Sequence, residues 1–221
     1  MFSPKLVLID LDGTLVDSVP DLAHAVDEMR KELGLSEHGE AVVRNWVGNG
    51  VERLVKRALT GELNAEPDQE LYERAYPVFY KHYLASNGVY SRLFPGVEEG
   101  LKFLQQRGYQ IGCVTNKAES FTLPLLEAKG VRKYFGVVVS GDTLPVKKPA
   151  PEPLLHAAKH FNVEPQDSLM LGDSMHDVQA ARSADFKVIA VSYGYNHGID
   201  IAEAKPDAII DSFVELKNLL Q

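Results

Sequence analysis

From Gly96 onward, short apolar runs alternate regularly with stretches in which apolar residues recur at helical spacing. The pattern predicts strands over residues 109–114, 136–140, 168–171, 187–191 and 208–210, and helices over residues 97–106, 119–128, 153–160, 177–184 and 212–220. Strands that alternate with helices form βαβ units with right-handed crossovers, and such units build a parallel sheet covered by helices on both faces. The sequence therefore predicts an α/β fold with a doubly wound, Rossmann-like parallel sheet.

The first strand of this sheet is expected near the start of the chain, over the apolar residues 6–9. It stops at Asp10 and Asp12, and Gly13 and Thr14 follow directly. Ligands of open α/β sheets bind beyond the carboxyl ends of the strands, so these two carboxylates are expected to point into a site. A plain Asp-Gly turn explains the same residues equally well unless the rest of the chain supplies partners for them.

The segment after the first strand differs from the rest of the chain because it contains only helical patterns. These predict helices over residues 19–33, 50–60 and 68–85. Ser18 is expected to cap the first of them, and Pro77 is expected to bend or interrupt the third. We therefore expect two domains, an α/β core formed by residues 1–16 and 88–221 and an inserted helical domain formed by residues 17–87.

Composition limits the partners that this chain is expected to have. It has 221 residues and a net charge of -8, and no run of Lys and Arg suggests contact with nucleic acid. Residues 1–10 carry no basic leader, and no apolar stretch approaches the roughly 18 residues that a membrane span requires. The single cysteine, Cys113, lies in an apolar run and is expected to be a buried structural thiol. We therefore expect a cytoplasmic protein without a membrane anchor, either a monomer or a homodimer.

Polar residues follow two of the later strands at the edge where Asp10 is expected. Thr115 and Asn116 come directly after one strand and could donate hydrogen bonds to phosphate oxygens, although alone they would be read more readily as a cap of the next helix. Lys148 follows another strand in a loop stiffened by Pro149 and Pro151, from which its ammonium could neutralise an anion. A solvated loop lysine is the simpler alternative.

Two more carboxylates, Asp173 and Asp177, follow the expected strand 168–171. Placed beside Asp10 and Asp12, they would repel one another strongly unless a cation lay between them. Mg²⁺ is the natural choice because it binds a few carboxylates together with water and phosphate oxygens. The full set offers a nucleophile, an acid and base, phosphate donors, a counter-charge and a metal site, which is what phosphoryl transfer requires.

In this order, the motifs resemble those of the haloacid dehalogenase superfamily of phosphatases across essentially the whole chain. The matching segments are residues 10–14, 115–116, 148–151 and 172–177. The resemblance implies that Asp10 is the nucleophile and that Asp12 protonates the leaving group and then activates water. It further implies that Thr115 binds phosphate beside Asn116 and that Lys148 holds the nucleophile and the phosphoryl group.

The same resemblance implies the metal site and the function of the insertion. Mg²⁺ would be bound by Asp10, the backbone carbonyl of Asp12, and Asp173, with Asp177 and Thr14 in support. The helical insertion looks like the small α-helical cap of that superfamily. The substrate is then expected to be a small-molecule phosphate ester.

A narrower similarity connects the chain with bacterial phosphoglycolate phosphatases and implies hydrolysis of 2-phosphoglycolate. It rests on residues 43–50, 141–149 and 193–196. In the first of these segments, Arg44 or Asn49 could bind a small carboxylate, whereas Trp46 is expected to pack in the core of the cap. The departures from the family pattern include Lys117-Ala118, His176 and His197, and none of them removes a catalytic group.

Two alternatives remain open from the sequence. A phosphatase or phosphomutase that acts on a sugar phosphate would have the same core. A signalling receiver domain also combines Mg²⁺, clustered Asp, Thr and Lys on a parallel sheet. The receiver is disfavoured because it would need neither the helical insertion nor a second acid and base carboxylate such as Asp12.

Overall fold

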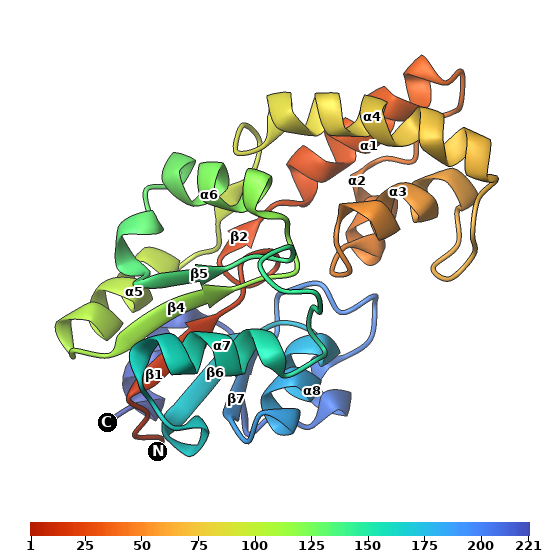
Figure 1. The fold of residues 1–221 in the computed structure, drawn as a ribbon. Coiled ribbons are helices and arrows are strands. Elements are labelled where there is room, and N and C mark those ends of the chain that lie inside the picture. Colours follow the sequence, from red (N-terminus) through yellow and green to blue (C-terminus); the bar gives the residue numbers. More distant parts are fainter.

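The computed structural model describes all 221 residues and contains a six-stranded sheet in which every neighbouring pair of strands is parallel (Figure 1). The strand order is β5-β4-β1-β6-β7-β8. The strands are β1 (Leu6–Ile9), β4 (Gln110–Val114), β5 (Val137–Val139), β6 (Ser168–Gly172), β7 (Lys187–Val191) and β8 (Ala208–Ile210). This arrangement confirms the predicted doubly wound parallel sheet.

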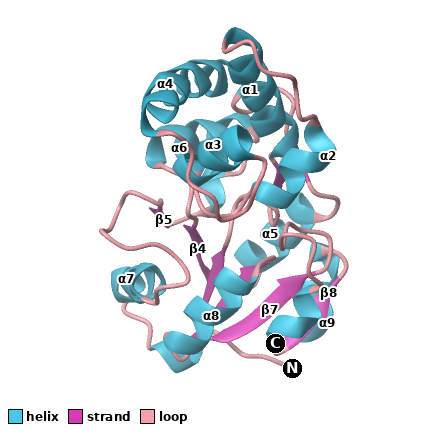
Figure 2. Cartoon of the chain, turned by 90° about the vertical axis from the view of Figure 1, so that its right-hand side faces the viewer, coloured by secondary structure: helices cyan, strands magenta, loops and turns pink.

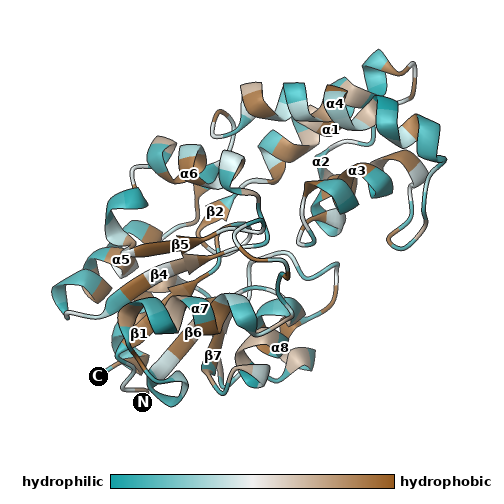
Figure 3. Ribbon diagram, viewed as in Figure 1, coloured by the Kyte–Doolittle hydropathy of each residue, from teal (hydrophilic) through white to brown (hydrophobic).

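Successive residues of a strand point to opposite faces of the sheet, and each face is covered by its own helices. On one face, Val7 and Ile9 share an apolar cluster with residues of α5 (Val97–Gln106), α6 (Glu119–Ala128) and α9 (Leu216–Leu219). On the other face, Leu6 and Leu8 pack with α7 (Glu152–Phe161) and α8 (Met175–Ser183). The strands are accordingly among the most hydrophobic parts of the ribbon in Figure 3. Cys113 is buried in the first of these clusters, as predicted for a structural thiol.

The helices of the insertion form a second body beside the sheet (Figures 1 and 2). They are α1 (Val19–Glu32), α2 (Glu40–Val43), α3 (Val51–Thr60) and α4 (Gln69–Ser86). Their apolar faces form a separate cluster, in which Met29, Val55 and Phe79 are fully buried. Phe121 of α6 and Tyr195 of the loop after β7 also belong to this cluster, so the second body packs directly on the sheet-containing part.

Two short strands were missed by the sequence prediction. β2 (Val16–Asp17) and β3 (Arg92–Leu93) pair antiparallel where the chain passes into and out of the helical insertion. Each strand has two residues, which is too short for a period-2 pattern to be visible. Single-turn 3-10 helices complete the fold at Arg44–Trp46, Arg132–Tyr134, Pro165–Asp167, Ile201–Ala204 and Phe213–Glu215.

The predicted interruption at Pro77 is wrong, because α4 runs without a break over 18 residues. Proline removes one helical N–H donor, but Pro77 is exposed, so water can hydrate the carbonyl that loses its partner. The expected Ser18 side-chain cap is also wrong, since the Ser18 hydroxyl is buried without a hydrogen-bond partner.

No helix in the structure combines the length and the hydropathy needed to cross a lipid bilayer.

Candidate active site

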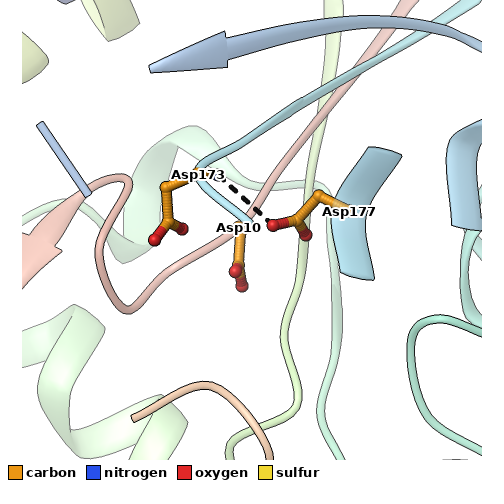
Figure 4. Close-up of side chains that lie close together, drawn as sticks. All are labelled: Asp10, Asp173 and Asp177. Atoms are coloured by element: carbon orange, nitrogen blue, oxygen red, sulfur yellow. Dashed lines mark hydrogen bonds between the residues drawn. The ribbon is translucent and has the colours of Figure 1, made fainter. Parts of the chain in front are cut away.

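Three aspartates meet beyond the carboxyl ends of neighbouring strands (Figure 4). Asp10 follows β1, Asp173 follows β6, and Asp177 lies in the first turn of α8. Because β1 and β6 are paired in parallel, their ends reach the same edge of the sheet. One carboxylate oxygen from each aspartate lies within 4.8 Å of the other two, so the three can hold a metal ion together.

The Asp173 carboxylate is held from two sides. The hydroxyl of Thr14 donates to Oδ1 at 2.8 Å, and the backbone N–H of Tyr195 donates to Oδ2 at 2.6 Å. The loop after β7 can approach this closely only because position 194 is glycine: a Cβ there would lie 2.1 Å from the Cβ of Asp173. Thr14 and the Tyr195 N–H therefore fix the direction of the Asp173 carboxylate.

The Asp177 carboxylate has two roles in the structure. It forms a capping box with Ser174, whose N–H and hydroxyl donate to Oδ2 at 3.0 and 2.7 Å. Its Oδ1 accepts from the Lys148 ammonium at 2.7 Å. Lys148 also lies 2.9 Å from Oδ1 of Asp10 and donates to the Val114 carbonyl at 2.8 Å. Lys148 is therefore buried against Asp10 and Asp177 and is not a solvated loop lysine.

The acidic cluster is electrostatically strained without a further cation. Burial raises the pKa of Asp10 to about 7, and the charge of Asp177 adds to this rise, while Lys148 opposes it. Burial and the charges of Asp177 and Asp10 raise the pKa of Asp173 well above its ordinary value. A divalent cation would relieve this repulsion, and a set of carboxylate oxygens is the donor type that Mg²⁺ prefers. The residues present therefore fit a magnesium ion.

Asp12, the second carboxylate of the first loop, is bound by Lys117. The sequence pattern marked Lys117 only as part of the Lys117-Ala118 difference from the family motif. The ammonium of Lys117 lies 3.0 Å from Oδ1 and 3.1 Å from Oδ2 of Asp12, and it also donates to the hydroxyl of Tyr83 in α4. Burial alone would lower the pKa of Lys117, but Asp12 and Tyr83 outweigh it and raise that pKa above its ordinary value. The lysine is therefore charged.

Thr115 and Asn116 do not cap the following helix, because α6 begins after Ala118 without a side-chain cap. The Thr115 hydroxyl accepts the backbone N–H of Lys117 at 3.2 Å. The Asn116 amide donates to the carbonyl of Gly48 at 3.1 Å and to the carbonyl of Lys148 at 3.0 Å. Asn116 therefore joins the lysine loop to the loop before α3.

Several of these residues line a cavity of about 40 Å³ between the sheet edge and the helical insertion. The sheet side contributes Asp10, Asp12, Thr115, Asn116 and Lys117. The opposite wall is largely apolar and consists of side chains of α1 and α3 together with the loop before α3. Reacting groups from one part of the chain thus face a cover made by another part.

The structure places Arg44 and Asn49 outside the lining of this cavity. Arg44 forms ion pairs with Asp17 at 3.2 Å and Glu40 at 2.7 Å. The Asn49 amide is 3.1 Å from Nε2 of His176, and its carbonyl oxygen accepts from Arg57 at 2.8 Å. Both residues are occupied by other protein groups in this conformation.

Trp46 packs in the apolar core of the helical insertion, as expected from the sequence. It is 5% exposed and belongs to the apolar cluster of the helical insertion. Its backbone carbonyl accepts from the Arg57 guanidinium, which ties the loop before α3 to that helix.

Comparison with known proteins identifies the family. The model of the haloacid dehalogenase-like hydrolases matches residues 4–185, which contain all the aspartates of the site. The chain belongs to this family. Membership places it among hydrolases and not among signalling receiver domains, the alternative that the clustered Asp, Thr and Lys had left open.

Relatives within the family extend over nearly the whole chain. A phosphoglycolate phosphatase of Nitrosococcus oceani is 56% identical over 217 residues, which cover 98% of this chain and 96% of that protein. A phosphoglycolate phosphatase of Nitrosospira multiformis is 51% identical with the same coverage. The crystal structure of a predicted phosphoglycolate phosphatase from Haemophilus somnus 129pt superposes with a TM-score of 0.93, at 36% identity and 99% coverage of both chains.

Proposed function

We propose that this haloacid dehalogenase-like phosphatase is a Mg²⁺-dependent enzyme that hydrolyses 2-phosphoglycolate to glycolate and phosphate. The observation that carries the reaction type is the contact of Asp10 with Lys148 at 2.9 Å inside a cluster of three aspartates, with Asp12 facing the same cavity. The choice of substrate is supported by the relatives at 56% and 51% identity, which are named phosphoglycolate phosphatases.

Asp10 is the nucleophile in this proposal. One of its carboxylate oxygens attacks phosphorus and forms an aspartyl-phosphate, while the bond from phosphorus to the ester oxygen breaks. Asp12, protonated at the start, gives its proton to that ester oxygen, and glycolate leaves. Asp12 then takes a proton from water as the water oxygen attacks phosphorus, which releases phosphate and restores Asp10.

Lys148 reduces the charge repulsion that opposes this attack. A carboxylate that approaches a phosphate dianion brings like charges together, and a fixed ammonium beside both offsets the cost. Burial would lower the pKa of Lys148, but Asp10 and Asp177 raise it more strongly, so the lysine is charged when Asp10 attacks.

The proposed metal ligands are Asp10, the backbone carbonyl of Asp12, and Asp173, with Asp177 in support through Lys148 and the capping box. Bound there, Mg²⁺ supplies positive charge that stabilises the oxygens of the transferring phosphoryl group. The protein contributes a fixed arrangement, because Thr14 and the Tyr195 N–H hold the Asp173 carboxylate in place before any ion binds. Thr115 is the proposed phosphate donor. Asn116 lies beside it in the same motif, with its amide bound to the carbonyls of Gly48 and Lys148.

We further propose that residues 17–87 act as a movable cap over a core formed by residues 1–16 and 88–221. The cavity of about 40 Å³ is narrow, which supports a small substrate and a cap that moves to admit it. A cap that opens for substrate and closes for chemistry also excludes bulk water from the phosphoryl group.

The test is phosphate release from a panel of esters: 2-phosphoglycolate, glucose 6-phosphate, fructose 6-phosphate and β-glucose 1-phosphate. We expect the highest kcat/KM for 2-phosphoglycolate, loss of activity in EDTA and recovery with added Mg²⁺. Faster turnover of the hexose phosphates would overturn the choice of substrate. Conversion of β-glucose 1-phosphate to its isomer would favour the phosphomutase alternative. Absence of phosphate release from every ester would overturn the proposed hydrolysis itself.

A further inference from the structure

Lys117 is a buried cation in the wall of the reaction cavity. Its side chain is 2% exposed, yet the residue contributes to the lining of the cavity together with Asp10 and Asp12. Its three N–H donors are shared between the two oxygens of Asp12 and the hydroxyl of Tyr83. Asp12 is proposed to protonate the ester oxygen of the substrate. Lys117 therefore lies beside the proposed proton donor and not beside the nucleophile Asp10.

No other cation of the region lines this cavity. Lys148 is engaged by Asp10, Asp177 and a backbone carbonyl. Arg57 donates to two backbone carbonyls and to the side chain of Asn49. Arg44 is paired with Asp17 and Glu40 and lines a different cavity, of about 390 Å³, together with Asp173. Lys147 is exposed. Among the residues that line this cavity, Lys117 is the one cationic side chain that a second anionic group of the substrate can meet, in exchange for one of the acceptors that Lys117 binds here.

The surroundings of Lys117 strengthen its pull on an anion. The opposite wall presents Leu22, Val51 and Leu54, so a charge in the cavity is shielded from water and its attraction to the ammonium is stronger than at the surface. Helix α3, which has 10 residues, begins directly after Gly50 on the same wall. The positive end of its dipole therefore also favours an anion at this place.

We propose that Lys117 binds the carboxylate of the substrate and so selects phosphate esters of small hydroxy acids over neutral esters of the same size. This inference rests on the proposed function. A substrate carboxylate that takes one N–H of Lys117 replaces one of the two contacts to Asp12. The remaining contact keeps Asp12 oriented, while its freed oxygen faces the ester oxygen that it must protonate. Binding of the correct substrate thus completes the arrangement for proton transfer.

The experiment compares two substrates that differ only in this charge, 2-phosphoglycolate and its neutral amide, 2-phosphoglycolamide. For the wild-type enzyme with Mg²⁺, we expect kcat/KM to favour the acid by about 100-fold or more, as expected where a buried group requires its partner. For Lys117→Met, we expect the ratio to fall to within about tenfold of unity. The ratio cancels any loss through Asp12, because both substrates need that residue.

Lys147→Met is the matched control, because it removes the same charge from an exposed lysine near Gly50. We expect this variant to keep the wild-type ratio. A wild-type enzyme without preference for the acid would overturn the proposed substrate together with this inference. A wild-type preference that Lys117→Met retains in full would overturn the inference alone and leave the proposed function standing.

A binding measurement covers the case in which Lys117→Met is too slow to assay. Titration calorimetry with Mg²⁺ compares 3-phosphonopropionate, a stable analogue of the substrate, with propylphosphonate, which lacks the carboxylate. We expect the wild-type protein to bind the first at least about 30-fold more tightly and the variant to bind both equally. Equal discrimination by both proteins would contradict the assignment of Lys117.

Discussion

At the scale of single residues, the site divides its carboxylates between two lysines. Lys148 contacts Asp10 and Asp177, whereas Lys117 contacts Asp12. Each proposed reacting carboxylate therefore has its own fixed counter-charge. The ammonium of Lys148 favours the ionised form of Asp10 that the attack requires.

Replacement of Asp10 by Asn removes the nucleophile but keeps the shape of the side chain. We expect turnover of 2-phosphoglycolate to fall by at least about 1000-fold, because a neutral amide oxygen does not attack phosphorus. Phosphate release measures the loss, and the circular dichroism spectrum checks that the fold is retained. Activity near the wild-type level in Asp10→Asn would rule out covalent catalysis by this residue.

The positions of Asp173 and Lys148 near Asp10 could be predicted from the sequence, whereas the contacts of Lys117 and Tyr83 could not. Asp173 and Lys148 follow expected strands, so topology alone brings them to the edge where Asp10 lies. The contact of Lys117 with Asp12 spans 105 positions, and its contact with Tyr83 spans 34. Tyr83 lies on the apolar stripe of a helix and therefore reads as a core residue. Only the packing of α4 against the sheet-containing part brings its hydroxyl to Lys117.

At the scale of elements, the loops after the strands fix the site through close backbone approach. Gly194 lies in the loop after β7, and its φ is not in the left-handed region, so alanine is permitted there by the backbone itself. The only obstacle is Asp173, whose Cβ would lie 2.1 Å from the new methyl group.

Replacement of Gly194 by Ala should therefore displace the Asp173 carboxylate. We expect the Mg²⁺ concentration needed for half-maximal activity to rise at least about tenfold, since misplaced ligands lose affinity. Gly108→Ala is the control, because this glycine has open space around it and is strained only by its φ of +80°. Unchanged Mg²⁺ dependence in Gly194→Ala would show that Asp173 does not take part in metal binding.

Two histidines contact the helical insertion from outside it. Nδ1 of His197 contacts the carbonyl of Asn45 at 2.9 Å, and His176 contacts Asn49. Burial lowers the pKa of His197 below its ordinary value, so the folded protein favours the neutral ring. Above about pH 6.5 the ring is neutral in both the folded and the unfolded chain, so it does not change the free energy of unfolding. As the pH falls below about 6.5, the unfolded chain binds the proton more readily, and the folded state is destabilised.

His197→Asn tests this contribution without straining the backbone, because φ at this position is +53° and Asn tolerates left-handed conformations. As the pH falls from 7.5 to 5.5, we expect the free energy of unfolding of the wild-type protein to change less favourably than that of the variant, because the variant lacks the cost of His197. Urea denaturation at both pH values measures the difference. An identical change in both proteins would mean that His197 does not titrate with folding in this range.

The arrangement of the loop before α3 could not be predicted from its sequence. Arg44 and Asn49 were natural candidates for a carboxylate site because one carries a guanidinium group and the other lies between Gly48 and Gly50. Their directions are set by neighbours that the local pattern does not reveal, Asp17 for Arg44 and Arg57 for Asn49. The alternation of strands and helices, by contrast, determines the sheet because buried strands and amphipathic helices have few ways to pack.

At the scale of the whole molecule, folding and metal binding are coupled. Without a cation, the raised pKa of Asp10, about 7, means that the folded state holds a proton that the unfolded chain releases near pH 4. The stability contributed by this group is therefore lost as the pH rises between these two values. A bound divalent cation favours the ionised carboxylates and reverses the loss.

We therefore expect Mg²⁺ to raise Tm relative to EDTA, and we expect this increase to grow from pH 5.5 to pH 7.5. In Asp10→Asn the growth with pH should be smaller, because one of the carboxylates that must ionise is absent. Thermal unfolding at the two pH values, with and without Mg²⁺, measures this effect. An increase in Tm that is the same at both pH values would contradict the coupling.

The formation of a phosphoenzyme at Asp10 is tested most directly by a single turnover. Enzyme in excess over ³²P-labelled 2-phosphoglycolate is mixed with Mg²⁺, quenched in acid within milliseconds and digested for mass spectrometry. We expect a label that hydroxylamine removes, located on the peptide that contains Asp10, and we expect it to decay rapidly as free phosphate appears. Phosphate release at the same rate without any labelled peptide would contradict the mechanism, as would a label on a different residue.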